Sequence, residues 1–378
     1  MQVATLVTPD GAYGGPIRVA LNQLEELQRR GHTVELVAGT SGFDEVPTQM
    51  QGVPVSLFPV RRVIPRSGFA GLTSPGLLAH VKRSLNSVDV AHVHMARDLV
   101  TLPAAAVIAR SEVPLFVQPH GMIDESGNPL AKVLDLVATR RVLHGSERVL
   151  SLTPEETQSL RAVAGHDLPI TTIANGVEIP ADRAAPTAGG LEFLFLARLH
   201  PRKRAPMFVR AASRLLSEGL DADFVLVGPD EGDGAEVREL IAASAESSRI
   251  RWEGSLPPDA TLGRMSTASV YVLPSVGEVL SMSILEAMSL GLPVVITDSN
   301  GLAPAVAAAE AGLVIDPTED ALVEALLRIA TDEPLRLRLG ANAAQLVESD
   351  YSIKAVGLQL ESLYRSHRTR EPSDSEQP

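Results

Sequence analysis

The sequence predicts an α/β protein with two domains, each built around a parallel β-sheet. Its 378 residues exceed what a single hydrophobic core usually supports. Short apolar runs alternate with longer amphipathic stretches along the chain, a pattern typical of repeated strand–helix units. Residues 181–190 turn to small side chains, Pro and Gly, which indicates a linker between the two domains.

The first domain is predicted to cover residues 1–180. A helix at Ile17–Arg30 carries apolar residues near helical spacing, and Gly31 is placed to end it. Seven apolar runs have the length and composition of buried strands. They are Val3–Thr8, Thr33–Ala38, Val53–Phe58, Val88–His94, Leu115–Gln118, Arg148–Leu152 and Ile170–Ile173.

The second domain is predicted to cover residues 191–350 and to begin with a strand at Leu191–Leu196. A helix at 351–367 follows it. The polar, Pro-containing residues 368–378 are expected to be disordered. The later strands of this domain are predicted at Phe224–Val227, Ile250–Trp252, Val270–Leu273, Pro293–Thr297 and Gly312–Ile315.

Composition excludes several classes of protein and of site. The chain has no cysteine, which rules out disulfides, iron–sulfur clusters and zinc–thiolate sites, and a cytoplasmic location fits. No run of about eighteen apolar residues is present to span a membrane, and the first residues indicate a buried strand rather than a signal peptide. The net charge of −13 argues against a nucleic-acid binder and allows at most weak peripheral contact with membranes.

The strongest signal of chemistry is a pair of carboxylates in residues 274–295, where a strand leads into a loop and then a helix. Glu278 precedes the helix and Glu286 projects from its second turn, so the two acids are placed to hold different parts of one extended ligand. In the alternative, both are ordinary solvated charges. The apolar surroundings of Glu286 argue against it, because a buried carboxylate without a partner is costly. The N–H groups that begin the helix are expected to favour an anion such as a diphosphate, and they belong to Leu280, Ser281 and Met282.

A second signal follows the strand that ends at Ala197. Ligands of open parallel sheets bind beyond the carboxyl ends of the strands, where cations suit a diphosphate and neutralise charge on a departing nucleotide. A solvated basic turn is the alternative interpretation. The position after a strand, together with the acid pair, favours a phosphate site. The cationic side chains of this segment are Arg198, Arg202, Lys203 and Arg204.

Together these motifs resemble the large retaining glycosyltransferase family four, the glycosyl transferases group 1, whose members have the GT-B fold. The resemblance spans nearly the whole chain and implies two facing Rossmann-like domains with a C-terminal helix that crosses back to the first. It implies that Arg198 and Lys203 bind the donor diphosphate. It further implies that Glu278 contacts the transferred sugar and Glu286 the ribose hydroxyls. Ser281 departs from the family, because many members have Gly there, and this bears on the choice of donor.

The resemblance also implies roles for residues outside these two motifs. Gly14 and Gly15, in a loop after the opening strand, are expected to lie against the donor diphosphate and the acceptor, although a purely structural turn stays open. Their spacing is not that of a dinucleotide-binding fingerprint, and the second strand lacks the acid that would hold a ribose. His120 is expected to face the transferred sugar, and Leu256 to line the pocket of the nucleotide base.

Three weaker features complete the pattern. His92 and His94 share one face of a strand, but with no third ligand at suitable spacing a packing or polar role is favoured over a metal site. Asn175 and Gly176 are expected, on the resemblance, to form the turn between the domains. A basic loop is either solvated or meets an acidic or lipid-linked acceptor, and it contains Arg61, Arg62 and Arg66.

The sequence therefore predicts an enzyme that moves a sugar from a nucleotide-diphosphate donor, a UDP- or GDP-sugar, to an acceptor hydroxyl with retention of the anomeric configuration. The acceptor would belong to glycan, glycolipid or natural-product biosynthesis. No cofactor or metal is expected, since cationic side chains would neutralise the leaving diphosphate. A nucleotide-sugar epimerase and a non-catalytic nucleotide-sugar-binding protein remain as alternatives. The residues expected to act in catalysis are His120, Glu278, Arg198 and Lys203.

Overall fold

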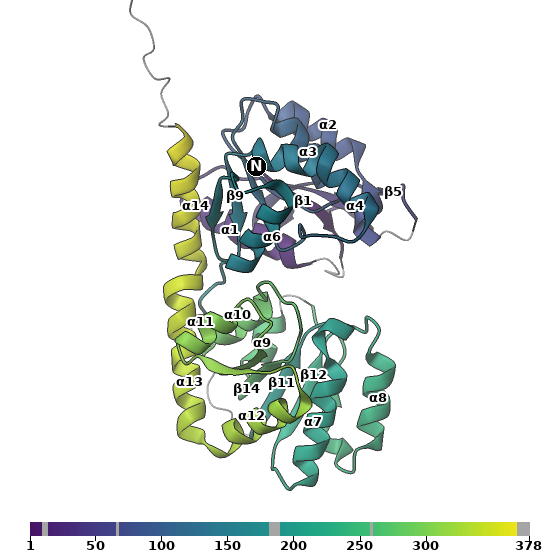
Figure 1. Ribbon diagram of the computed structural model, residues 1–378, viewed down its shortest axis with the longest axis vertical. Coiled ribbons are helices and arrows are strands. Elements are labelled where there is room, and N and C mark those ends of the chain that lie inside the picture. Colours follow the sequence, from purple (N-terminus) through teal and green to yellow (C-terminus); the bar gives the residue numbers. More distant parts are fainter. Residues whose placement is uncertain (10–13, 66–67, 181–189, 258–259, 369–378) are drawn as a thin grey trace, which may run out of the picture. The chain divides into compact units, whose positions relative to one another are not determined.

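The computed structural model describes residues 1–9, 14–65, 68–180, 190–257 and 260–368 (Figure 1). They belong to two compact units, one formed by Met1–Gly176 together with the chain from Ile353 onward and the other by Val177–Ser352. Both units have parallel sheets with connecting helices, which confirms the α/β fold class. The predicted linker, apart from Gly190, and the predicted disordered tail, apart from Arg368, lie outside the described residues.

Unit 1 is built on an eight-stranded sheet in the order β10-β9-β8-β7-β1-β2-β4-β3. All neighbouring strands run parallel except β3 and β4, and a short antiparallel pair, β5 and β6, stands apart. The strands are β1 (Gln2–Val7), β2 (Leu36–Thr40), β3 (Gln49–Met50), β4 (Val53–Pro59), β5 (Arg61–Arg62), β6 (Leu72–Thr73), β7 (Ala91–His94), β8 (Leu115–Gln118), β9 (Arg148–Ser151) and β10 (Ile170–Thr172). The helices are α1 (Gly14–Arg29), η1 (Gly68–Gly71), α2 (Pro75–Ser84), α3 (Thr101–Ile108), α4 (Pro129–Leu134), η2 (Asp135–Thr139), α5 (Arg140–His144), α6 (Pro154–Ala164) and α14 (Ile353–Arg368).

Unit 2 is built on a six-stranded parallel sheet in the order β13-β12-β11-β14-β15-β16. The order reverses between β11 and β14, as in a Rossmann-like sheet. The strands are β11 (Glu192–Leu196), β12 (Asp223–Val227), β13 (Ile250–Trp252), β14 (Val270–Leu273), β15 (Val294–Thr297) and β16 (Gly312–Ile315). The helices are η3 (Pro201–Lys203), α7 (Ala205–Ser217), α8 (Gly234–Ala243), η4 (Ser247–Arg249), α9 (Thr261–Met265), α10 (Met282–Ser289), α11 (Ala303–Ala308), α12 (Glu319–Thr331), α13 (Glu333–Leu346) and η6 (Val347–Tyr351).

The last helix, α14, packs on unit 1, where it lies alongside α1 (Figure 1). A side chain at Gly357 would collide with Glu26 of α1, since a Cβ atom there would lie 2.4 Å from the Cγ of Glu26. The ion pair of Arg30 with Glu361, at 2.7 Å, joins the same two helices. The fully buried cluster between α14 and the sheet consists of Phe116, Leu150, Ile173, Ile353, Val356 and Leu360.

The boundaries of the units differ by a few residues from those expected from the sequence. Unit 1 ends at Gly176 rather than at residue 180, because the Val177 N–H donates to the Tyr351 carbonyl and Val177 pairs with Ser352. The final helix accordingly begins at Ile353 and not at residue 351. A Cβ atom at Gly176 would lie 2.7 Å from the Cα of Ile353, so this close approach requires glycine.

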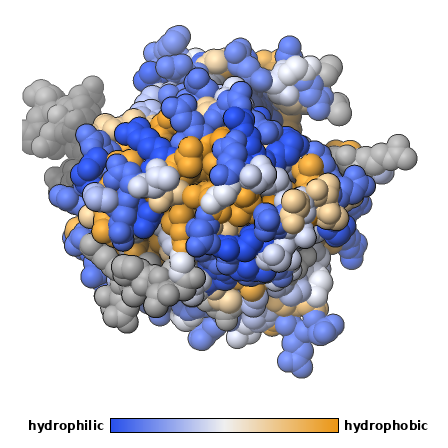
Figure 2. Space-filling model, turned by 90° about the horizontal axis from the view of Figure 1, so that it is seen from below, coloured by the Kyte–Doolittle hydropathy of each residue, from blue (hydrophilic) through white to orange (hydrophobic). Residues whose placement is uncertain are grey.

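Apolar side chains also reach the surface of both units. On the face seen in Figure 2, hydrophobic residues gather between larger areas of hydrophilic ones. None of the helices in the described ranges has both the length and the apolar character needed to cross a bilayer. The large apolar residues with exposed side chains are Val46, Val63, Ile64, Val133, Leu136, Val137, Leu327, Leu337 and Leu358.

Truncation of Leu360 is expected to destabilise unit 1, because its side chain is fully buried in the cluster under α14. Leu360→Ala should cost about 2–5 kcal/mol through lost burial and a residual cavity. Leu358→Ala, two residues away on the same helix, should cost less than about 0.5 kcal/mol because Leu358 is 56% exposed. Urea unfolding followed by circular dichroism measures both. Equal costs would contradict the packing of α14 described above.

Candidate functional site

The two motifs of unit 2 meet where β11 and β14 end. These strands are parallel neighbours, with Phe193 paired to Val270 and Leu194 to Tyr271. The loops at 197–204 and 274–281 therefore leave the sheet side by side, at the point where the strand order reverses. Open parallel sheets bind ligands at such a position.

Arg202 ties the two loops together. Its side chain donates to the carbonyls of Val276, at 3.4 Å, and Gly277, and its own carbonyl accepts from the Val276 N–H at 2.9 Å. The short helix η3 that carries Arg202 is closed by the Lys203 N–H, which donates to the His200 carbonyl at 2.7 Å. The guanidinium of Arg202 is thus hydrogen-bonded to the backbone of the neighbouring loop.

Lys203 and Glu278 form an ion pair across these loops. The Lys203 Nζ lies 2.8 Å from the Glu278 Oε1, and the side chains are only 16% and 14% exposed. The cation predicted to bind phosphate and the acid predicted to contact sugar are thus brought together. Partial burial strengthens their attraction relative to a pair in bulk water.

Glu278 is also held through its backbone, by a segment that the sequence patterns did not single out. Its carbonyl accepts from the Gly301 N–H at 2.8 Å, and it pairs with Asn300 in an isolated bridge. Asn300 is buried, and its side-chain Oδ1 accepts from the Leu302 N–H at 2.9 Å. Its Nδ2 is buried without a hydrogen-bond partner among the described residues, so Asn300 has an amide donor to spare.

Arg198 binds a different acid from the predicted pair. Its Nη1 lies 2.7 Å and 3.0 Å from the two carboxylate oxygens of Glu231, and its side chain stays 48% exposed. Glu231 reaches it because the loop after β12 is bonded to Leu199, whose carbonyl accepts from the Glu231 N–H at 3.1 Å. Gly228 makes this possible, since a Cβ atom there would lie 2.0 Å from the Ala197 carbonyl oxygen. Glu231 was not foreseen.

The second acid, Glu286, lies on α10 and is 5% exposed, which agrees with the expectation that it is buried. The helix begins where predicted, with Ser281 as N-cap, but the Ser281 side chain makes no capping bond and lies 3.1 Å from the Ser283 hydroxyl. The Tyr271 hydroxyl lies 2.7 Å from Ser283 and 2.9 Å from the Leu196 carbonyl. Burial, with the nearby charges of Glu286 and Glu278, raises the pKa of Tyr271, which keeps this hydroxyl neutral.

Leu280 and Met282 flank the start of α10 and are partly buried against the core of unit 2. Leu256 packs on the same core after β13. Trp252, four residues earlier, donates from Nε1 to the Gly228 carbonyl at 3.0 Å. The segment predicted to line a base pocket is therefore anchored next to the loop that carries Glu231, at the carboxyl ends of the strands.

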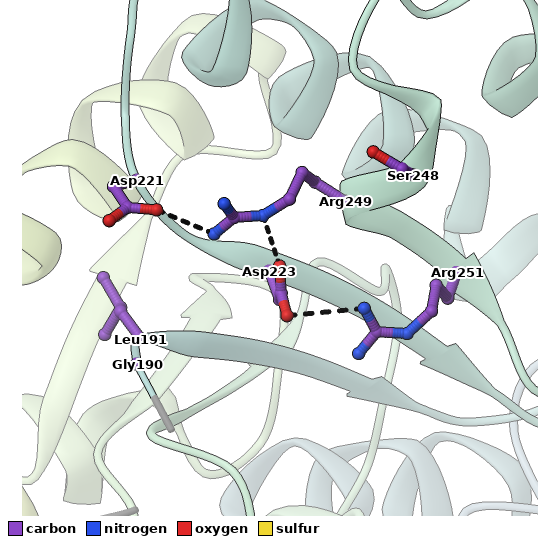
Figure 3. A pocket seen from close by; sticks show the side chains of 7 residues that line it. All are labelled: Gly190, Leu191, Asp221, Asp223, Ser248, Arg249 and Arg251. Atoms are coloured by element: carbon purple, nitrogen blue, oxygen red, sulfur yellow. Dashed lines mark hydrogen bonds and ion pairs between the residues drawn. The ribbon is translucent and has the colours of Figure 1, made fainter. Parts of the chain in front are cut away.

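A polar recess lies at the opposite, amino-terminal end of the strands (Figure 3). Arg249 bonds to Asp221 at 2.9 Å and also to Asp223, and Arg251 bonds to Asp223 at 3.3 Å. Two guanidinium groups and two carboxylates satisfy one another there. The recess is a network of ion pairs at the amino edge of the sheet, away from the loops that carry Lys203 and Glu278.

The other residues with a predicted role lie in unit 1. Gly14 and Gly15 open α1, and the residues at 10–13 lie outside the described part. His120 follows β8 with a φ of +54°, a left-handed conformation that costs a non-glycine residue roughly 1–3 kcal/mol. A buried carboxylate, Glu156, holds the next residue by accepting from the Gly121 N–H at 2.5 Å. The role expected of His120 stays a prediction.

Three histidines of unit 1 stack on one another. The ring centroids of His92 and His94 are 4.6 Å apart, and those of His94 and His120 are 5.0 Å apart. Burial lowers the pKa of His92 and of His120 to about 3 each, with the charge of His120 adding to the effect on His92. Burial, followed by the charges of His92 and His120, holds the pKa of His94 well below its usual value. All three rings are therefore neutral near pH 7.

No group of three or more His, Asp or Glu residues in the described ranges is arranged to hold a metal ion. His92 and His94, the pair weighed for such a role, take part in hydrogen bonds with Tyr364 and His120, both at 2.7 Å. Asn175 and Gly176 stand at the end of unit 1, as expected for a turn between the domains. Arg61 and Arg62 form β5, and Arg66 lies outside the described residues.

Both halves of the chain match families of known proteins. Residues 182–346 match the family described as "Glycosyl transferases group 1", and residues 14–176 match the "Glycosyl transferase 4-like domain". Among curated proteins, the alpha-D-kanosaminyltransferase of Streptomyces kanamyceticus is 30% identical over 275 residues, or 67% of this chain and 70% of that protein. The phosphatidyl-myo-inositol mannosyltransferase of Mycolicibacterium smegmatis is 26% identical over 93% of this chain and 90% of its own length.

Solved structures share the fold over almost the whole chain. Sucrose-phosphate synthase from Thermosynechococcus elongatus matches with a TM-score of 0.78 at 20% identity, covering 98% of this chain and 100% of that chain. HepE from Anabaena, solved in complex with UDP-glucose, matches with a TM-score of 0.74 at 17% identity, covering 97% and 100%. At these identities the likeness concerns the fold.

The neutral histidines predict a loss of stability in acid. Unfolded histidines titrate near pH 6.5, whereas the pKa of folded His92 and His120 is about 3. Between these values the unfolded chain binds protons that the folded chain does not. The free energy of unfolding should therefore fall as the pH drops below 6.5, by up to about 1.4 kcal/mol per pH unit for each histidine.

Urea unfolding at pH 7.5, 6.5 and 5.5 measures this slope. His92→Phe, which keeps a ring in the stack, should reduce this slope by the contribution of about one proton. His166→Gln is the control, because His166 is exposed, and should leave the slope unchanged. A wild-type slope equal to that of His92→Phe would show that His92 is protonated in the folded state.

Proposed function

Since the chain belongs to the group 1 glycosyltransferases with the GT-B fold, we propose that it transfers a sugar from a UDP- or GDP-sugar to an acceptor hydroxyl with retention of configuration. Transfer from a nucleotide-sugar donor is the activity of the class to which the chain belongs. The complex of HepE with UDP-glucose favours a UDP-sugar as donor. Relatives of the chain include a D-inositol 3-phosphate glycosyltransferase, a 2-deoxystreptamine glucosyltransferase and a phosphatidyl-myo-inositol mannosyltransferase, which favours a polyhydroxylated acceptor from natural-product or glycolipid biosynthesis.

The ion pair of Lys203 and Glu278 carries this proposal. A donor diphosphate offers Lys203 a charge-assisted partner in place of Glu278. Release from Lys203 leaves the Glu278 carboxylate free to accept hydrogen bonds from hydroxyl groups of the sugar. On binding of the donor, the diphosphate would replace Glu278 as the partner of Lys203, and the sugar would replace Lys203 as the partner of Glu278. The two side chains already lie next to each other before the donor binds.

Other residues of unit 2 would make further contacts with the same donor. Arg198 is half-exposed, so its guanidinium can stabilise charge on the leaving diphosphate while one side stays bonded to Glu231. The uncapped N–H groups at the start of α10 offer further donors to a phosphate. Glu286, farther along that helix, suits ribose hydroxyls. These cations and N–H donors would replace a divalent metal ion, and retention would follow from attack and departure on one face of the sugar.

Lys203→Ala should weaken binding of UDP or GDP about 10- to 100-fold, since a charge-assisted hydrogen bond contributes roughly 1.5–3 kcal/mol. Isothermal titration calorimetry measures it. Arg214→Ala, which removes a 48% exposed arginine on the next helix, is the matched control and should bind as the wild type does. The double variant Lys203→Ala/Glu278→Gln separates loss of the cation from the effect of an unpaired carboxylate. Unchanged nucleotide binding in both Lys203 variants would remove the site assignment.

Product analysis tests the reaction itself. With an α-linked donor and a panel of inositol and aminocyclitol acceptors, NMR of the product should show an α-glycosidic bond, and EDTA should leave the rate unchanged. Glu278→Gln should lower turnover while nucleotide binding persists. A β-linked product would contradict retention. Isomerisation of the donor without an acceptor would favour the epimerase, and binding without turnover would favour the non-catalytic binder.

A further inference from the structure

The ring of His120 is held by a hydrogen-bonded chain that runs into the interior of unit 1. The His120 Nε2 lies 2.7 Å from the His94 Nδ1, and the His94 Nε2 lies 2.8 Å from the Gln2 Oε1. The two rings are nearly parallel, at 15°. His94 ends β7 and pairs in register with Gln118 of β8, so the strand pairing sets the position of both rings.

The amides beyond His94 decide which nitrogens carry protons. Gln2 donates from Nε2 to the Gln23 Oε1 at 3.1 Å, and Gln23 donates from Nε2 to the Gln118 Oε1 at 3.2 Å. Gln118 in turn faces Asn175, with its Nε2 3.4 Å from the Asn175 Oδ1. Each amide gives its NH₂ group to the next residue, so the Gln2 carbonyl oxygen is the group turned toward His94.

This order has one consistent solution for the histidines. The Gln2 oxygen can only accept, so the His94 Nε2 carries a proton and the His94 Nδ1 is an acceptor. The His120 Nε2 must then donate to it. In a neutral ring only one nitrogen is protonated, which leaves the His120 Nδ1 as a bare acceptor. Hydrogen bonds that all point the same way along a buried chain strengthen one another.

The groups around these rings do not favour a positive charge. His92 stacks on His94, Tyr364 of α14 bonds to His92, and the buried Glu156 of α6 has both oxygens bonded to the N–H groups of Leu152 and Gly121. The amino group of Met1 adds a positive charge that disfavours protonation of His92. Across the described ranges, no carboxylate is hydrogen-bonded to the ring of His94 or His120.

We propose that His94 is a positioning residue that holds His120 in the neutral Nε2–H tautomer, so that the His120 Nδ1 is left as a bare acceptor for a hydroxyl group of a substrate. The part that concerns the substrate rests on the function proposed above. A bare ring nitrogen matches a neutral hydroxyl group, which can donate to it.

Nitrogen-15 NMR of the unliganded protein, labelled at its nine histidines, tests the tautomer without any substrate. The expected result is a protonated Nε2 and an unprotonated Nδ1 at His120, unchanged from pH 8 to pH 5.5. A protonated Nδ1, or an imidazolium in that range, would overturn the proposal whether or not the protein transfers sugar. Conversely, the predicted tautomer in a protein that transfers no sugar would leave the positioning role standing and remove only the proposed function.

Variants of His94 then test its effect on turnover. His94→Phe keeps the stacked ring but removes the acceptor, so the nitrogen-15 spectrum of His120 should show a mixture of the two neutral tautomers and kcat should fall about tenfold. His94→Asn restores an acceptor oxygen near the place of Nδ1 and should recover the single tautomer and most of the activity. His92→Phe is the control, because His92 stacks on His94 but, within the described ranges, is hydrogen-bonded to neither His94 nor His120.

A merely structural role of His94 would lower stability and leave the tautomer of His120 unchanged. Equal behaviour of His94→Phe and His94→Asn would therefore contradict the proposal. If His94→Phe does not fold, Gln2→Met takes its place. Gln2→Met removes the acceptor for His94 and should mix the tautomers of His120.

Discussion

The proposed donor site depends on the contact between the loops that follow β11 and β14. Parallel strand pairing brings the two loops together, Arg202 fixes one to the carbonyls of the other, and Lys203 then meets Glu278 at 2.8 Å. Without the backbone tie, a lysine and a glutamate 75 residues apart would have to find each other as long, flexible side chains. The tie removes most of that entropic cost before any ligand arrives.

The hydrogen-bonded side chains around His94 in unit 1 are neutral, in contrast to the ion pairs of unit 2. His94 and the glutamines bonded to it lie in the interior, where charge is costly, and a chain of hydrogen bonds runs through them from the partly buried His120 to Asn175. The strained backbone of His120 persists because the strand register, the chain of bonds and Glu156 all hold the same conformation. Unit 2 thus holds paired charges at its proposed phosphate site, whereas the histidine and glutamine side chains of unit 1 are polar without charge.

Much of this architecture could be predicted from the sequence, since buried parallel strands and the helix start at Ser281 leave clear local patterns. The acid pair and Lys203 could be found for the same reason. Side-chain contacts that depend on strand register or on loop packing could not be predicted from the sequence. Glu231 reaches Arg198 only through the close approach at Gly228, and the bond between His94 and His120 depends on how β7 lies against β8. No local pattern encodes either arrangement.

The placement of α14 has a consequence for the order in which the chain matures during synthesis. Unit 1 is interrupted by the whole of unit 2, and its cluster around Phe116 and Leu150 stays open until Ile353, Val356 and Leu360 have left the ribosome. All strands and helices of unit 2 lie in one continuous stretch of the chain. Its folding therefore requires no residue that is synthesised after it. The nascent chain therefore completes its middle portion first and closes the amino-terminal portion last, which inverts the usual sequence of domain folding on the ribosome.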